Sequence, residues 1–141
     1  MLRKKLLLLV FVTAFIFNGC SIDDDGPNFH FTALEIVAAE LPESFDFNRT
    51  YMITVNYLKP DGCTSYEGFD VVKEGLTVRN VVAVGAVRTD SEVCTQEVSE
   101  ETASFYFTVV YTDSYTFKFY TGETSEGEPE YIEVVVPVNA P

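Results

Sequence analysis

The feature that most constrains the fold of this chain is a two-residue alternation of apolar and polar side chains in several short segments. In residues 51–57 the apolar members of one set are Tyr51, Ile53, Val55 and Tyr57. Successive side chains of a β-strand point to opposite faces, so this spacing turns one set toward a core and the other outward. The pattern predicts a half-buried β-strand.

The same alternation recurs in three later segments. The inward positions that it predicts are Phe105, Phe107, Val109 and Tyr111, then Tyr115, Phe117 and Phe119, then Ile132, Val134, Val136 and Val138. Weaker strand candidates are residues 31–38, 66–73 and 77–88, and no segment shows sustained helical spacing. About seven short strands in about 110 residues predict an all-β fold, an antiparallel immunoglobulin-like β-sandwich over residues 29–141.

The connection between the fifth and sixth predicted strands, at residues 104–111 and 115–120, leaves two topologies open. The stretch TDSYTFKF, residues 112–119, is similar to the start of the tyrosine corner in immunoglobulin-like sandwiches, but one residue shorter. A connection of three residues, 112–114, also suits a plain hairpin that keeps both strands in one sheet. The two strands therefore pair only under the second alternative.

The first residues have the order of an export signal. Arg3, Lys4 and Lys5 precede an apolar run at residues 6–17, which small and polar residues follow. This run is too short for a transmembrane helix, which needs about 20 residues to cross the hydrocarbon core. We expect residues 1–19 to be removed and the remaining chain to be exported.

The exported part is strongly acidic. Three of the nine basic residues lie in the signal, so six remain against 22 acidic residues, a formal net charge of −16. Such a surface repels the phosphates of nucleic acids and anionic headgroups. We therefore expect no nucleic-acid binding. The charge mildly favours a cationic partner, although the solubility of an exported domain accounts for it as well.

The three cysteines divide into two roles. Cys20 ends the signal, whereas Cys63 and Cys94 lie inside the folded region. In an oxidising compartment the simplest pairing joins Cys63 to Cys94 and leaves Cys20 for other chemistry. The two loops that hold them lie at the same end of a sandwich. A disulfide that closes a loop of about 31 residues stabilises a domain by roughly 3 to 4 kcal/mol.

The residues around Cys20 resemble a bacterial lipoprotein signal. Residues 17–20, FNGC, resemble a lipobox, which is cleaved before a cysteine whose sulfur takes a diacylglycerol; Gly19 and Cys20 fit its commonest pattern. The acidic stretch that follows resembles the export signal that Bacteroidota place after the lipidated cysteine. Its residues here are Ser21, Asp23, Asp24 and Asp25, with Ile22 between them.

This resemblance implies a location. Cys20 would carry the lipid anchor, residues 20–28 would form an acidic tether, and the domain would be displayed on the outer face of the outer membrane. An ordinary secretory signal that is cleaved near Gly19 is the alternative. The mature region also resembles small flavobacterial lipoprotein domains of unassigned function, through YLKPDGC, a single later cysteine and YTFKFYTG in this order. That likeness implies no particular activity.

Few residues suit catalysis or a cofactor. His30 is the only histidine, and no nucleophile elbow, P-loop or dinucleotide-binding glycine motif occurs. We therefore expect no enzymatic activity and no cofactor. With 22 acidic residues, a carboxylate-dependent hydrolase is an alternative. That alternative predicts a cleft that holds a carboxyl group of raised pKa.

Two groups of exposed residues are candidates for recognition. Acidic residues gather in two loops at one end of the predicted sandwich: Glu123, Glu126, Glu128 and Glu130, with Asp90 and Glu92. Their spacing matches no calcium motif, so we interpret them as a solvated rim and expect no metal site. If the fifth and sixth strands pair, Tyr106 and Tyr120 flank Lys118 in a shallow binding face; cross-strand packing is the alternative.

Together these features predict an outer-membrane, surface-exposed lipoprotein. Its domain would be a non-enzymatic binding module for a glycan, a peptide or another envelope component. An envelope-accessory structural lipoprotein without a ligand is the first alternative, and the hydrolase is the second.

Overall fold

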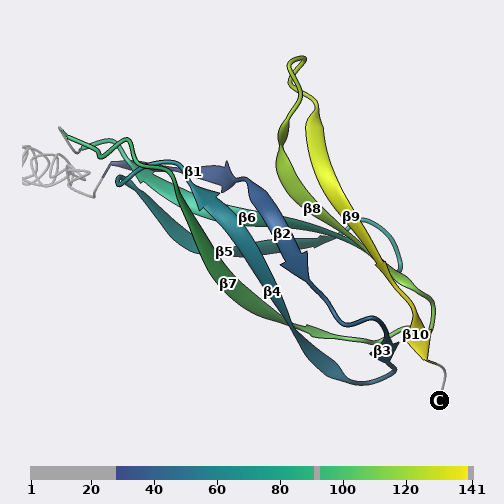
Figure 1. Ribbon diagram of the computed structural model, residues 1–141. Coiled ribbons are helices and arrows are strands. Elements are labelled where there is room, and N and C mark those ends of the chain that lie inside the picture. The colour runs from purple at the N-terminus through teal and green to yellow at the C-terminus, as the bar shows by residue number, and fades with distance from the viewer. Residues whose placement is uncertain (1–27, 91–92, 140–141) are drawn as a thin grey trace, which may run out of the picture.

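The computed structural model describes residues 28–90 and 93–139, and this part of the chain is all-β (Figure 1). Its strands form a five-stranded sheet, a three-stranded sheet and a two-stranded ribbon. They are β1 (Phe29–Leu34), β2 (Ile36–Glu40), β3 (Phe45–Asp46), β4 (Thr50–Lys59), β5 (Thr64–Lys73), β6 (Val78–Arg88), β7 (Ser99–Thr108), β8 (Tyr115–Glu123), β9 (Pro129–Val136) and β10 (Val138–Asn139). The predicted all-β sandwich is confirmed.

The three-stranded sheet is antiparallel and has the order β2–β4–β7. Its central strand pairs with β7 along its whole length, from Thr50 opposite Thr108 to Lys59 opposite Ser99. In β4, Ile53 is fully buried and Met52 is exposed, as the two-residue alternation predicts.

The five-stranded sheet is built around β6. One edge of β6 pairs with β5, and the opposite edge is shared by two strands. Along this shared edge, residues 83–88 pair with β1 in antiparallel fashion and residues 78–81 pair with β8 in parallel fashion. β9 then pairs with β8. Among the seven predicted strands, β5 corresponds to the third and β8 to the sixth. In an immunoglobulin constant domain the third strand lies beside the sixth, whereas here β6 lies between β5 and β8.

The core between the sheets is rich in aromatic rings. Phe107 from the three-stranded sheet lies edge-on to Tyr115 and Phe117 of β8, with ring centroids 5.0 Å apart in both pairs. Phe45, which β3 supplies, contacts the same cluster and is fully buried. Edge-to-face pairs of this kind contribute about 0.5–1.5 kcal/mol each beyond the burial of their area.

Two predicted strands are divided by changes of sheet. The segment predicted at residues 31–38 is two strands, because the chain passes at Glu35 from β1 in one sheet to β2 in the other. Pro137, which has no N–H for a ladder, separates β9 from β10. Its carbonyl oxygen accepts a 2.8 Å hydrogen bond from the Phe45 N–H, and β10 continues beside β3.

The connection from β7 to β8 passes between the two sheets, so the hairpin alternative is wrong. The side chain of Tyr115 explains this path. Its fully buried hydroxyl oxygen accepts hydrogen bonds from the backbone N–H groups of Val110 and Tyr111, both at 3.1 Å. This is the geometry of a tyrosine corner, in which a Tyr at the start of a strand bonds to the backbone a few residues upstream.

Candidate binding groove

The binding face predicted from Tyr106, Lys118 and Tyr120 is not formed. Tyr106 lies on β7 in the three-stranded sheet and is 77% exposed, whereas Lys118 and Tyr120 lie on β8 in the other sheet. The prediction required β7 and β8 to pair, and the tyrosine corner at Tyr115 places them in different sheets. Tyr106 is therefore an exposed ring on the other sheet, opposite Met52 of β4.

Lys118 is occupied by contacts within its own sheet. Its Nζ lies 3.2 Å from Glu74 Oε2 and 4.8 Å from the ring centroid of Tyr131 on the neighbouring strand. The hydrogen bond to Glu74 raises the pKa of Lys118, and hydrogen bonds from Asn80 and Lys118 lower the pKa of Glu74. Lys118 therefore takes part in cross-strand packing, which was the predicted alternative to a binding face.

The second half of β8 leaves the sheet and opens a groove. After Phe119, which is opposite Val81 of β6, β8 pairs only with β9. A register shift between Tyr120 and Gly122 marks a β-bulge, a feature that bends and twists a strand. Gly122 has a φ of 121°, a conformation that favours glycine. Figure 1 shows the resulting hairpin bending away from β1; we call residues 120–131 the arm.

A groove of about 380 Å³ lies between the arm and the junction of β1 with β2. Its lining includes Ala33 and Glu35 at the junction, Leu58 and Val98 beneath, and Tyr120 and Gly122 on the arm. Val98 is 59% exposed. The volume is within the range of about 300–1,000 Å³ that is typical of ligand sites. We call this feature the arm groove.

Two carboxylates act on the phenol of Tyr120 in the arm groove. Burial is the first cause that raises the pKa of Tyr120, and the negative charges of Glu123 and Glu35 raise it further. Among the described residues, neither of these glutamates forms an ion pair. The groove therefore combines an apolar floor with one lining carboxylate, Glu35, and the charge of a second, Glu123, acts on its Tyr120. Neither carboxylate has an ion pair in the described part of the chain.

Two exposed phenylalanines of β1 lie on the outer face of the five-stranded sheet. Phe29 and Phe31 are 49% and 64% exposed, and their rings meet edge-on at 5.3 Å. They line a shallow depression together with Ala86 and Arg88 of β6. These two rings were not singled out in the sequence analysis. The alternation of Phe29, Phe31 and Ala33 was the signal that identifies this face.

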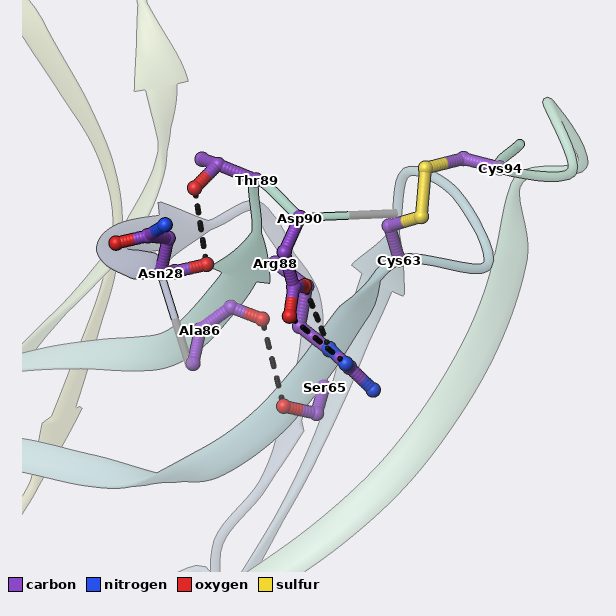
Figure 2. Close-up of polar contacts among 8 residues, drawn as sticks. All are labelled: Asn28, Cys63, Ser65, Ala86, Arg88, Thr89, Asp90 and Cys94. Carbon is purple, nitrogen blue, oxygen red and sulfur yellow. Dashed lines mark hydrogen bonds and ion pairs between the residues drawn. A yellow bond between two sulfur atoms is a disulfide. The ribbon is translucent and has the colours of Figure 1, made fainter. Parts of the chain in front are cut away.

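The end of the sandwich where β1 begins is closed by the predicted disulfide. Cys63 and Cys94 are bonded, with their Cα atoms 5.3 Å apart, and they join the loops before β5 and before β7 (Figure 2). The backbone N–H and the hydroxyl of Thr89 both donate to the carbonyl oxygen of Asn28 nearby. The predicted pairing and its position at one end are confirmed.

One carboxylate of the predicted acidic rim, that of Asp90, is paired within the fold. Asp90 accepts two 3.1 Å hydrogen bonds from Arg88 (Figure 2), and this pairing lowers the pKa of Asp90. Glu92 lies outside the described residues. Glu123, Glu126, Glu128 and Glu130 lie on the arm or at its tip. Within residues 28–90 and 93–139, no three His, Cys, Asp or Glu side chains are grouped to hold a metal ion.

The carboxyl groups with shifted pKa values do not suit a proton donor. The shifted groups are Asp61, Glu74, Asp90 and Glu101, and hydrogen bonds lower the pKa of each. A hydrolase of the predicted kind needs a carboxyl group whose pKa is raised. The surroundings of these four groups therefore lower the pKa, whereas such a proton donor needs surroundings that raise it.

The predicted lipid anchor cannot be placed on this structure. Cys20 and the export-signal residues Ser21, Asp23, Asp24 and Asp25 lie outside the described residues. In the described part of the chain, no helix has the length and apolar character to cross a membrane.

Comparison with known proteins adds no relative. The chain matches no family model, no curated protein and no solved structure.

Proposed function

We propose that this protein is a lipid-anchored lipoprotein of the outer membrane, displayed on the cell surface, and that its β-sandwich is a non-enzymatic binding module. The signal at residues 1–19, Cys20 and the acidic residues after it support the anchor. The observation that carries the binding role is the arm groove, which is lined by Leu58, Val98 and Glu35. The charge of Glu123 also acts on Tyr120 of the groove, and neither glutamate has an ion pair among the described residues.

The arm groove has the composition of a recognition site. Apolar side chains supply the area whose burial drives association, at roughly 25 cal/mol per Å². Tyr120 adds a ring with a polar end, a combination that is common at interfaces. Glu35 and Glu123 select for positive charge in a ligand.

A short tether limits where the partner lies. Phe29 follows Cys20 by nine positions, and a fully extended chain spans at most about 3.6 Å per residue. The start of β1 is then held within about 30 Å of the lipid, so the partner is an envelope component or a ligand that reaches the cell surface.

The anchor is tested by the variant Cys20→Ser. Cells that express it should incorporate no labelled palmitate into the protein, which should leave the membrane fraction. The double variant Cys63→Ala, Cys94→Ala is the matched control, because it also loses thiols but keeps the lipidated one. An unlipidated Cys20→Ser chain that still partitions into detergent with the membranes contradicts the anchor.

The binding role is tested by cross-linked pull-down from intact cells, with a glycan array beside it. Val98→Asp places a charge in the apolar floor of the arm groove and should abolish recovery of the partner. Val93→Asp is the matched control, because Val93 is 87% exposed, lies in the same connection and does not line the groove. Equal recovery by wild type and Val98→Asp contradicts a binding role for the groove.

A further inference from the structure

We infer that the arm groove receives an extended, basic polypeptide segment that adds as a further strand to the free edge of β1. This inference rests on the proposed function and names the partner class of the same site. It is carried by three observations: the direction of the backbone groups of β1, the exposed rings on the same strand and the charge of the groove.

Within the described residues β1 pairs with β6 alone, so its other edge is free. In an antiparallel ladder, alternate residues direct both N–H and C=O toward the same neighbour. Arg88 is opposite Phe29 and donates its N–H to Cys63, on the β5 side. The pair of Arg88 with Phe29 is therefore a non-hydrogen-bonded pair. It follows that Phe29, Phe31 and Ala33 direct their backbone groups away from β6.

The position beside the free edge of β1, where an added strand would lie, is open because β8 leaves the sheet. β8 occupies the same edge of β6 as β1 does, but only as far as Phe119 opposite Val81. The arm then bends away, and Ala33 and Tyr120 line opposite sides of the groove between them. A free strand edge is a template for pairing with another chain, and strand addition is a common mode of peptide recognition.

The exposed rings lie where an added strand would cover them. Phe29 and Phe31 alternate along the free edge, and both project from the outer face of the sheet. Residues directly opposite on neighbouring strands have Cβ atoms about 4.5–5.5 Å apart, close enough for aromatic side chains to pack across the pair. Strand addition would therefore bury two side chains that no other strand of the described structure covers.

The charge of the groove selects a basic segment. Glu35 lines the groove, the charges of Glu35 and Glu123 both act on Tyr120, and neither glutamate has an ion pair among the described residues. The whole chain has a formal net charge of −13, so a second copy would be repelled. The expected ligand alternates β-branched or aromatic residues with polar ones, contains Lys or Arg, and has no Pro at the pairing positions.

The inference is tested by panning random dodecapeptides displayed on phage against the full protein, purified in detergent. Ala33→Pro removes an N–H that the fold does not use, and edge strands tolerate Pro at such positions. Ala33→Ser keeps the N–H and is the matched control. Wild type and Ala33→Ser should enrich the same basic, alternating peptides. Synthetic copies of these should bind Ala33→Pro at least about tenfold more weakly, the effect of losing one or more hydrogen bonds.

A second variant covers the case in which Ala33→Pro does not fold, which circular dichroism reports. The double variant Glu35→Gln, Glu123→Gln leaves the backbone unchanged and should weaken the enriched peptides about tenfold at low salt. It should also reduce the salt dependence of their binding.

Several results overturn strand addition. These are undiminished binding to a folded Ala33→Pro, enriched peptides without basic residues, no enrichment over bare beads, or a wild-type dimer that Ala33→Pro dissolves in sedimentation. If Val98→Asp loses its cellular partner while Ala33→Pro keeps it, the proposed function stands and strand addition fails. If Val98→Asp keeps its partner as well, both fail.

Discussion

The first and second halves of β8 differ in what they pair with. Residues 116–119 pair with both β6 and β9, Tyr115 pairs with β9, and the side chains of Tyr115, Phe117 and Phe119 are fully buried. Residues 120–123 pair with β9 alone and form the base of the arm. One continuous strand thus contributes to the core at one end and to the candidate site at the other.

The difference arises from competition for one edge of β6. Leu34, the last residue of β1, is opposite Ala83, and Phe119 of β8 is opposite Val81. The two strands therefore pair with neighbouring stretches of the same edge of β6. Only one strand can pair with each position of an edge. Where β1 takes the edge, β8 must leave it, and the bulge at Gly122 accommodates the change of direction.

Phe117→Ala removes a core side chain from the first half of β8, and we expect it to lower the free energy of unfolding more than any other variant proposed here. The ring is fully buried against Phe45, Phe107 and Tyr115, so its loss leaves a cavity. The free energy of unfolding should fall by about 3–5 kcal/mol in denaturant titration. Tyr106→Ala, on an exposed aromatic, is the control and should change it by no more than about 0.5 kcal/mol. Similar losses for both variants would contradict the assignment of the core.

Raising the pH should destabilise the body of the sandwich through Tyr57. Burial, followed by the charge of Glu101, raises the pKa of Tyr57 to about 12 from its ordinary value of 10.0. The folded protein keeps this proton at a pH where the unfolded chain loses it, so stability is retained below pH 10 and falls between pH 10 and 12. The loss should reach at most about 3 kcal/mol.

Tyr57→Phe provides the comparison for this pH dependence. Thermal melts at several pH values should show a shallower decline for this variant than for wild type. Tyr106→Phe is the control on an exposed ring. A decline of the same steepness in Tyr57→Phe would mean that another group causes it.

Tyr115→Phe should weaken the corner that separates β7 from β8. It removes the acceptor for the N–H groups of Val110 and Tyr111 and keeps the ring. Leaving these partly buried donors without a partner should cost at most about 1–3 kcal/mol. Chemical denaturation should show this loss, and amide exchange at Val110 and Tyr111 should accelerate. Unchanged exchange at these two amides would contradict the corner.

Gly122→Ala should affect the second half of β8 and leave the first half intact. The φ of 121° is strained for any side chain, although nothing lies near the added Cβ. The expected cost is about 1 kcal/mol or somewhat more. It should appear in hydrogen exchange as faster local opening of residues 120–131, while the amides of Phe117 and Phe119 keep their protection. Equal acceleration in both halves would show that the arm is not an independent unit.

Local patterns were sufficient to predict most strands and their faces. The alternation in residues 51–57 and 115–120 identified the buried members of β4 and β8, because the direction of a side chain in a strand depends only on its position. The pairing of Cys63 with Cys94 was also predictable, since two internal cysteines in an oxidising compartment have one intramolecular pairing.

The candidate site was predicted only in fragments. Tyr120 was chosen as an exposed aromatic, yet its partners across the groove, Ala33 and Glu35, lie more than 80 residues earlier in the chain. Val98 and Leu58 carried no signal of their own, because a single apolar residue at the end of a strand does not distinguish core from groove.

The sequence by itself determined most of the segments that are strands and, for the clearest of them, which side chains face inward, because both follow from the local geometry of an extended backbone. The tertiary structure alone decided which edges pair. That choice depends on contacts between distant residues, above all the hydrogen bonds of the Tyr115 hydroxyl and the division of one edge of β6 between β1 and β8. The arm groove exists because of that division.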